Sequence, residues 1–168
     1  MACALGEKYV LRELIGSGGM GLVYAAEQSC LKRTVAVKLM RSEFAADTYM
    51  LRRFHTEAIV GSQLHHPNLV SILDYGDDAD APFLVMELVR GEALTDLLAS
   101  EGTLEPRRAA KIVGGLLAGL AAAHAARIVH ADVKTDNLII EQIDGDEAAK
   151  LIDFGLARSL DEPSQNVP

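Results

Sequence analysis

The stretch His130-Ala131-Asp132-Val133-Lys134-Thr135-Asp136-Asn137 decides how this sequence is interpreted. It fits the pattern H-x-D-x-K-x-x-N, which chance would produce in on the order of one chain in several thousand of this composition. The pattern offers a carboxylate to receive a hydroxyl proton, a lysine to neutralise negative charge and an amide oxygen for a hard cation. Asp153-Phe154-Gly155 follows and adds a second oxygen ligand on a turn that contains glycine. These segments therefore predict a chemical site rather than packing alone.

A glycine cluster lies upstream, at Gly16-Ser17-Gly18-Gly19-Met20-Gly21, and fits G-x-G-x-x-G. Missing side chains let backbone N–H groups approach phosphate oxygens, although a glycine-rich hairpin explains this cluster equally well when it is taken alone. A dinucleotide-binding fold would need a helix directly after the glycines, whereas Leu22-Val23-Tyr24-Ala25 is typical of a strand. The pattern G-x-x-x-x-G-K-[ST] does not occur, which excludes a Walker-type loop.

Lys38 follows the apolar run Val35-Ala36-Val37 in a predicted strand. A buried ammonium group needs an anionic partner, either a carboxylate or a phosphate, because an isolated buried charge is costly. Glu57, in the next predicted helix, is a candidate partner. The alternatives are a lysine that extends to solvent from a strand edge and an ordinary glutamate on a helix surface.

Hydrophobic periodicity predicts strands first and helices later. Short apolar runs indicate an antiparallel meander, and a three-to-four spacing then indicates one helix that ends near His66-Pro67. Pro106 suits the first position of a long helix. The predicted strands are 9–11, 14–15, 22–24, 35–37, 69–73 and 83–88, with an acidic turn at 77–80; the predicted helices are 47–66, 93–99 and 106–126; a small hairpin is predicted from 138–140 and 150–152.

Composition restricts the partners and the compartment. The 168 residues include 16 Lys and Arg against 24 Asp and Glu, a net charge of −8, which works against broad binding to nucleic acid. Cys3 and Cys30 form no metal or disulfide pattern, so a reducing cytoplasm is the simplest expectation. The apolar stretch 112–123 is shorter than the roughly 20 residues that cross a bilayer, so we expect no membrane contact within this chain.

The order of the motifs, from the glycine loop to Asp-Phe-Gly, resembles the eukaryotic-like, bacterial-type serine/threonine protein kinase family between about Tyr9 and Arg158. The resemblance implies an α+β, bilobal fold with a five-stranded antiparallel N-lobe, one long helix and an incomplete helical C-lobe. The implied division is an N-terminal tail at 1–8, the N-lobe at 9–88, a partial C-lobe at 89–160 and a tail at 161–168.

The resemblance also implies ATP and Mg²⁺ as cofactors and assigns roles to residues. Asp132 is the implied catalytic base, helped by Lys134, and Lys38 is implied to hold the α- and β-phosphates while it pairs with Glu57. Asn137 and Asp153 are the implied Mg²⁺ ligands. The implied nucleotide contacts are the loop residues Ile15, Gly16, Ser17, Gly18, Gly19 and Gly21, the adenine sandwich of Val23, Ala36 and Ile139, the gatekeeper Met86, and the backbone of Glu87 and Val89.

The sequence departs from the family pattern in two ways. Ala131 stands where most regulated members carry an arginine that anchors an activating phosphate, so we expect activity that does not depend on that switch. No A-P-E follows Gly155, which indicates a kinase domain truncated after this motif. Apolar faces within 112–126 are then expected to be exposed and to favour association with another chain.

The predicted function is therefore a serine/threonine protein kinase region that transfers the γ-phosphate of ATP to hydroxyl groups of a protein substrate. One alternative is a pseudokinase or regulatory fragment that binds nucleotide without transferring phosphate. Another is a kinase of similar fold that acts on small molecules, although Leu64-His65-His66-Pro67-Asn68-Leu69-Val70 resembles the link that protein kinases place after their helix.

Overall fold

The chain folds into two units, each described by itself, in a computed structural model that describes residues 4–5, 8–78, 81–143 and 145–160. The first unit comprises Met1–Ser62 and Ser71–Val89, and the second comprises Gln63–Val70 and Arg90–Pro168. The predicted tail at 161–168 lies outside the described residues, as do parts of the predicted tail at 1–8 and of the acidic turn at 77–80.

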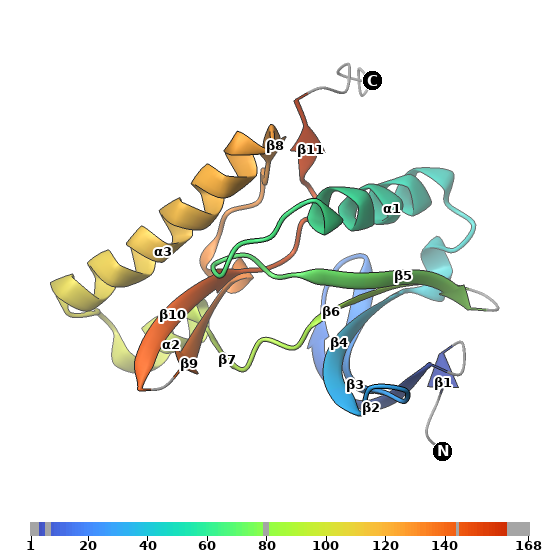
Figure 1. The fold of residues 1–168 in the computed structure, drawn as a ribbon, viewed down its shortest axis with the longest axis horizontal. Coiled ribbons are helices and arrows are strands. Elements are labelled where there is room, and N and C mark those ends of the chain that lie inside the picture. The colour runs from blue at the N-terminus through green and yellow to red at the C-terminus, as the bar shows by residue number, and fades with distance from the viewer. Residues whose placement is uncertain (1–3, 6–7, 79–80, 144, 161–168) are drawn as a thin grey trace. The chain divides into compact units, whose positions relative to one another are not determined.

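An antiparallel sheet forms most of the first unit (Figure 1). Five of its strands match the predicted N-terminal sheet. A two-residue strand, too short to show a sequence pattern, adds to its edge. The sheet has the order β1-β2-β3-β4-β6-β5 and consists of β1 (Ala4–Leu5), β2 (Tyr9–Ser17), β3 (Gly21–Gln28), β4 (Arg33–Met40), β5 (Ile72–Asp78) and β6 (Ala81–Glu87).

The predicted strand at 69–73 is wrong at its start, because β5 begins at Ile72. Leu69 and Val70 are apolar for another reason: both are buried in the second unit, where Val70 N–H donates to the carbonyl of Leu151 at 2.9 Å. At its other end β5 continues through Asp77 and Asp78, which pair with β6. Backbone pairing at this end overrides the turn preference of aspartate.

The α1 helix (Thr48–Ser62) packs on β5 and β6 within the first unit (Figure 1). Asp47 directly precedes the helix, and its carboxylate accepts hydrogen bonds from the backbone N–H groups of Tyr49 and Met50 at 2.8 and 3.2 Å, which caps the helix. Apolar side chains of α1 and the sheet form one core cluster, Met40, Phe54, Ala58 and Leu84, and a second cluster includes Tyr9, Val35, Val37 and Val85. A short 3₁₀ helix, η1 (Ser42–Phe44), links β4 to α1.

The second unit combines two helices with short strands (Figure 1). One three-stranded sheet has the order β10-β9-β7, and one strand pair joins β11 to β8. The elements are β7 (Gly91–Ala93), α2 (Leu94–Glu101), α3 (Pro106–Ala125), β8 (Ile128–Val129), the 3₁₀ helix η2 (Thr135–Asn137), β9 (Leu138–Ile143), β10 (Asp146–Leu151) and β11 (Arg158–Ser159). With the sheet and long helix of the first unit, these elements confirm the predicted α+β fold.

The α3 helix begins with Pro106 at its first position, and the Glu105 carboxylate accepts the N–H of Arg108 at 3.0 Å. One side of α3 packs on β10 and β8, whereas Val113 and Leu117 are 49% and 59% exposed. Apolar side chains of this helix are therefore exposed, and association through them stays a prediction. Among the described residues, no helix is both long and apolar enough to cross a membrane.

Candidate functional site in two halves

The glycine loop connects β2 to β3 in the first unit. A Cβ atom at Gly21 would lie 2.6 Å from the carbonyl oxygen of Leu39, so close backbone packing requires glycine there. A Cβ at Gly18 would meet only the Gly21 carbonyl oxygen, at 3.9 Å, and a Cβ at Gly19 would meet nothing within 4 Å. Packing within the protein therefore explains Gly21 and leaves space beside Gly18 and Gly19 for a ligand.

Lys38 and Glu57 form the ion pair that the sequence suggested. The Nζ of Lys38 donates to Oε1 and Oε2 of Glu57 at 2.7 and 2.9 Å, and the two side chains are only 9% and 2% exposed. Strand β4 supplies the ammonium group and helix α1 the carboxylate. The buried carboxylate therefore holds the Lys38 ammonium at a fixed position, and a charged ammonium attracts anionic groups such as phosphate.

The predicted adenine and phosphate contacts of the first unit share one face of the sheet. Antiparallel register pairs Gly16 with Val23, Val23 with Lys38, and Ala36 with Met86. Opposed residues lie on the same face, and Ala36 and Lys38 are two apart on β4, so all five residues face one way. Sheet register therefore brings together residues that are far apart in sequence.

The remaining predicted contacts of the first unit lie at its edges. Ile15 is 45% exposed, next to the glycine loop. The Glu87 N–H donates to the carbonyl of Ser71 at 3.0 Å, and the Glu87 carboxylate accepts the N–H of Ser71 at 2.7 Å. Both of these groups of Glu87 are therefore engaged within the protein, and half-buried Val89 follows the end of β6.

A separate group of predicted site residues belongs to the second unit and centres on Asp132. Its Oδ2 accepts hydrogen bonds from Nζ of Lys134 at 2.8 Å and from Nδ2 of Asn137 at 3.0 Å. The hydrogen bond from Lys134, followed by the one from Asn137, lowers the pKa of Asp132 against the opposing effect of desolvation. The same contact raises the pKa of Lys134. The pair is therefore charged at neutral pH, with a carboxylate able to accept a proton.

His130 holds this loop against the Asp-Phe-Gly segment. Burial lowers its pKa, which favours the neutral ring. Its Nδ1 accepts the N–H of Asp132 at 3.3 Å, and its Nε2 lies 3.2 Å from the carbonyl of Ile152, which assigns the proton to Nε2. The ring also packs on Phe154, with centroids 4.9 Å apart. His130 is thus a structural group beneath the loop.

Asn137 and Asp153 are held close to each other by the backbone. The Ile152 N–H donates to the carbonyl of Asn137 at 2.8 Å, so the residue after Ile152 lies beside Asn137. Asn137 uses its side-chain Nδ2 to bind Asp132, which leaves its amide oxygen as the atom that can face a cation. Asp153 has a positive φ of 64° and accepts the Gly155 N–H on Oδ1 at 3.1 Å. An amide oxygen and a carboxylate suit Mg²⁺, which binds few protein ligands together with phosphates.

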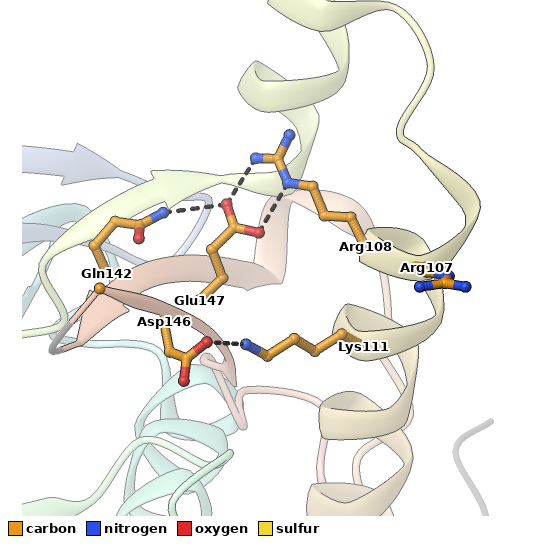
Figure 2. Close-up of a pocket in the computed structure, with 7 residues that line it drawn as sticks. Arg107, Arg108, Lys111, Gln142, Asp146 and Glu147 are labelled. Carbon is orange, nitrogen blue, oxygen red and sulfur yellow. Dashed lines mark hydrogen bonds and ion pairs between the residues drawn. The ribbon is translucent and has the colours of Figure 1, made fainter.

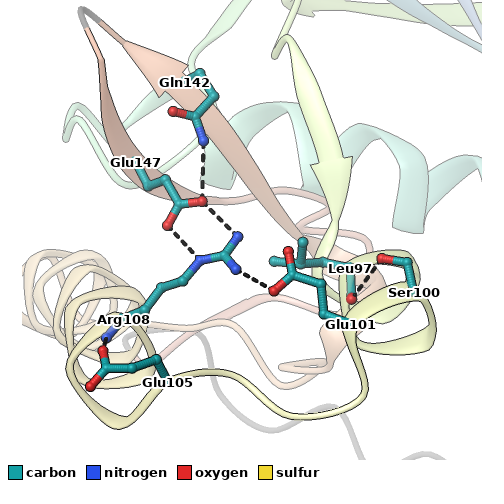
Figure 3. A network of polar contacts seen from close by, with 7 residues as sticks. All are labelled: Leu97, Ser100, Glu101, Glu105, Arg108, Gln142 and Glu147. Atoms are coloured by element: carbon teal, nitrogen blue, oxygen red, sulfur yellow. Dashed lines mark hydrogen bonds and ion pairs between the residues drawn. The ribbon is translucent and has the colours of Figure 1, made fainter.

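A polar groove of about 530 Å³ occupies another part of the second unit (Figure 2). Arg108 binds the Glu147 carboxylate through Nε and Nη2 at 2.8 and 2.7 Å, and Lys111 binds Asp146 at 2.7 Å. Figure 3 shows Arg108 also reaching Glu101, so that one guanidinium joins α2, α3 and β10. None of the described lining residues is a predicted site residue, and the groove is explained as a structural ion-pair network.

Two contacts near the predicted site were not anticipated from the sequence. Arg41, three residues after Lys38, binds Ser17 and Gly18 of the glycine loop. In the second unit, the Thr95 hydroxyl donates to that of Thr135 at 2.6 Å and ties α2 to the loop of Asp132. A basic residue at the end of the Lys38 strand is the only sequence signal for the first contact, and Thr95 gives none.

Comparison with known proteins extends these observations. Residues 9–167 match the family model of the protein kinase domain. The chain is 40% identical over 153 residues to serine/threonine-protein kinase PrkC of Bacillus subtilis, covering 91% of this chain and 23% of that protein. It is 42% identical over 156 residues to serine/threonine-protein kinase PknL of Mycobacterium tuberculosis, covering 93% and 38% of the two chains.

A third relative is serine/threonine-protein kinase pkn2 of Myxococcus xanthus, 44% identical over 152 residues that cover 90% of this chain and 18% of the relative. The chain thus spans less than two fifths of the length of these relatives. The family match includes strands β2 to β6 of the first unit and the loop of Asp132 in the second, and the chain therefore belongs to the protein kinase domain family.

Proposed function

We propose that this chain binds Mg²⁺ and ATP and transfers the γ-phosphoryl group to a serine or threonine hydroxyl of a protein substrate. The observation that carries the proposal is the loop in which Lys134 and Asn137 both contact one carboxylate oxygen of Asp132. A proton acceptor is thereby held within hydrogen-bond distance of a cation and of the Asn137 amide nitrogen. Protein kinases as a family use ATP and Mg²⁺.

Nucleotide binding is assigned to the first unit together with Ile139 of β9. The space beside Gly18 and Gly19 suits phosphate oxygens, which backbone N–H groups can approach closely. Lys38, fixed by Glu57, supplies positive charge to the α- and β-phosphates. Val23 and Ala36 on the same sheet face offer apolar surface to adenine, with Met86 as gatekeeper. The remaining proposed contacts are Ile15, Gly16, Ser17, Gly21, the backbone of Glu87 and Val89, and the side chain of Ile139.

The proposed mechanism relies on position and charge. When bound, Mg²⁺ with ATP supplies the phosphoryl group and neutralises part of its charge, with Asn137 and Asp153 as its protein ligands. Asp132, ionised because of Lys134, orients the substrate hydroxyl and accepts its proton. Lys134 and Lys38 offset negative charge on the phosphoryl oxygens. Neutral His130 keeps the Asp132 loop joined to the segment that carries Asp153.

Two features of the sequence support proposals about the substrate class and about activation. Lys134 stands two residues after Asp132, as in the serine/threonine branch of the family, and the relatives described above carry that name. Ala131 cannot bind a phosphate through a charge-assisted hydrogen bond, so we propose activity without an arginine-anchored phosphate in the activation segment. We assign the reaction to the cytoplasm, where ATP is available and an exposed thiol such as Cys30 stays reduced.

The proposal is tested with Asp132→Asn and a matched control, Asp136→Asn, which makes the same chemical change at an exposed position four residues later in the same loop. Labelled phosphate transfer from ATP to a generic serine/threonine substrate should fall about 10²- to 10⁴-fold for Asp132→Asn and little for Asp136→Asn. Mg-ATP should raise the melting temperature of all three proteins, because the nucleotide binds only the folded state.

The outcomes separate the three functions. Nucleotide binding without transfer by the wild type identifies the pseudokinase alternative. Transfer to small molecules but not to protein hydroxyls identifies the small-molecule kinase alternative. Transfer to protein that survives the Asp132→Asn substitution contradicts the proposed role of this carboxylate.

A further inference from the structure

Arg41 contacts the glycine loop at three points within the first unit. Its backbone N–H donates to the carbonyl of Met20 at 3.2 Å. Its guanidinium donates through Nη2 to the Ser17 hydroxyl at 2.9 Å and through Nε to the Gly18 carbonyl at 3.4 Å. These contacts reach both sides of the loop tip. Within the loop itself, Gly18 N–H donates to the carbonyl of Gly21 at 2.9 Å.

A loop this rich in glycine needs such contacts more than an ordinary hairpin does. Glycine loses more conformational freedom than any other residue when its backbone is fixed. A loop that is ordered only when a ligand arrives must lose that freedom on binding, which weakens affinity. Contacts that order the loop beforehand reduce this loss, as any preorganised binding element does.

The position of Arg41 also connects the loop to Lys38. Arg41 directly follows β4, which carries Lys38 three residues earlier and pairs with β3 along its length. The guanidinium is a rigid planar group with several donors, so it can hold a hydroxyl and a carbonyl at once, which an ammonium on a flexible stem does less well. One strand end therefore fixes the loop tip at a set distance from the lysine.

We propose that Arg41 is a positioning residue that preorders the glycine loop for the phosphates of the nucleotide. This inference rests on the proposed nucleotide-binding function of the same unit. Arg41 acts through Ser17 and Gly18 and is not itself assigned a contact with the nucleotide. Arg41 contacts the glycine loop and not the adenine face of the sheet. We therefore expect it to contribute to the binding of phosphates and not of adenine.

The first experiment measures the loop without any ligand. Amide hydrogen exchange of residues 17–21 should be faster in the full chain carrying Arg41→Ala than in the wild type. The matched control is Arg12→Ala, which removes another arginine side-chain hydrogen bond, to Glu27 at 2.6 Å, from the same β2–β3 hairpin. Exchange of 17–21 that is unchanged in Arg41→Ala, or equally faster in Arg12→Ala, overturns the proposal.

The second experiment measures affinity for Mg-ATP, Mg-ADP and adenosine. Arg41→Ala should weaken both phosphate-bearing ligands by about threefold to tenfold, the range of one or two exposed hydrogen bonds, and leave adenosine unchanged. KM for ATP should rise with kcat nearly constant, since the contact is present before and during the reaction. General damage to the fold would weaken adenosine as well, and that outcome refutes the positioning role.

A double variant tests whether Arg41 acts through Ser17. If Arg41 acts through Ser17, Ser17→Ala should lose part of the same affinity, and Arg41→Ala with Ser17→Ala should lose less than the two single effects combined. Independent effects refute that route. Failure of the wild type to bind Mg-ATP overturns the proposed function and this inference together, whereas normal binding by Arg41→Ala overturns the inference alone.

Discussion

Removing the carboxylate of Glu57 should destabilise the chain far more than removing an average glutamate. The side chains of Lys38 and Glu57 are 9% and 2% exposed, and both carboxylate oxygens lie within hydrogen-bond distance of the ammonium. Breaking a buried pair by removing one member costs about 3 to 5 kcal/mol, because the other charge stays in a poorly solvated site. Glu57→Leu should therefore lower the free energy of unfolding by about this amount.

The matched variant replaces the whole pair. Substituting apolar residues for both members of a buried ion pair is often neutral or stabilising. Lys38→Met combined with Glu57→Leu should therefore return the free energy of unfolding to within about 1 kcal/mol of the wild type. Phosphate transfer should stay lost, since the proposed phosphate-binding cation is gone. This result would show that the Lys38–Glu57 pair is needed for phosphate transfer and does not increase the free energy of unfolding.

Urea unfolding followed by far-UV circular dichroism suits this test, because the chain contains 0 tryptophan residues. With a slope of at most about 3 kcal/mol per molar, a loss of about 3 kcal/mol shifts the midpoint by about 1 M or more. A shift below about 0.3 M for Glu57→Leu would contradict the burial of this pair. A double variant as unstable as the single one would contradict the charge argument.

Three further predictions concern the loops. Gly21→Ala should lower the urea midpoint of unfolding, because the added Cβ would lie 2.6 Å from a backbone carbonyl oxygen. Gly19→Ala should leave the midpoint unchanged, because its Cβ would meet nothing within 4 Å. Equal effects of the two substitutions would refute the packing argument. Lys134→Met should raise the pKa of Asp132 toward its ordinary value of 3.8, because the hydrogen bond from Lys134 is the largest cause of the lowered pKa. A ¹³C titration of the Asp132 carboxyl group that shows no rise would contradict this. Burial lowers the pKa of folded His130, so the unfolded chain protonates first and stability should fall as pH drops below about 6.5. Urea midpoints at several pH values should show this fall, and His130→Phe should reduce it; an equal fall in both proteins would refute the assignment.

The fold class was predictable because its signals are local. Short apolar runs separated by turn residues indicated the strands, and the proline that starts α3 indicated that helix, since backbone preference and periodicity depend on near neighbours. The same reasoning was wrong for the start of β5. Leu69 and Val70 are apolar because they pack in the second unit, and a strand-like run does not say which partner buries it.

For the candidate site, too, the sequence identified some features and the tertiary structure decided others. Residue types and spacing identified the HADVKTDN loop and the glycine loop, because such chemistry requires particular groups in a fixed order. The family resemblance implied that Lys38 pairs with Glu57, and the structure shows this pair. Only the tertiary structure decided that Gly21 alone among the loop glycines Gly18, Gly19 and Gly21 is required by close packing, and that Arg41 holds the loop tip. Those facts depend on distances between segments about 18 to 24 residues apart, which are set by strand register and helix packing.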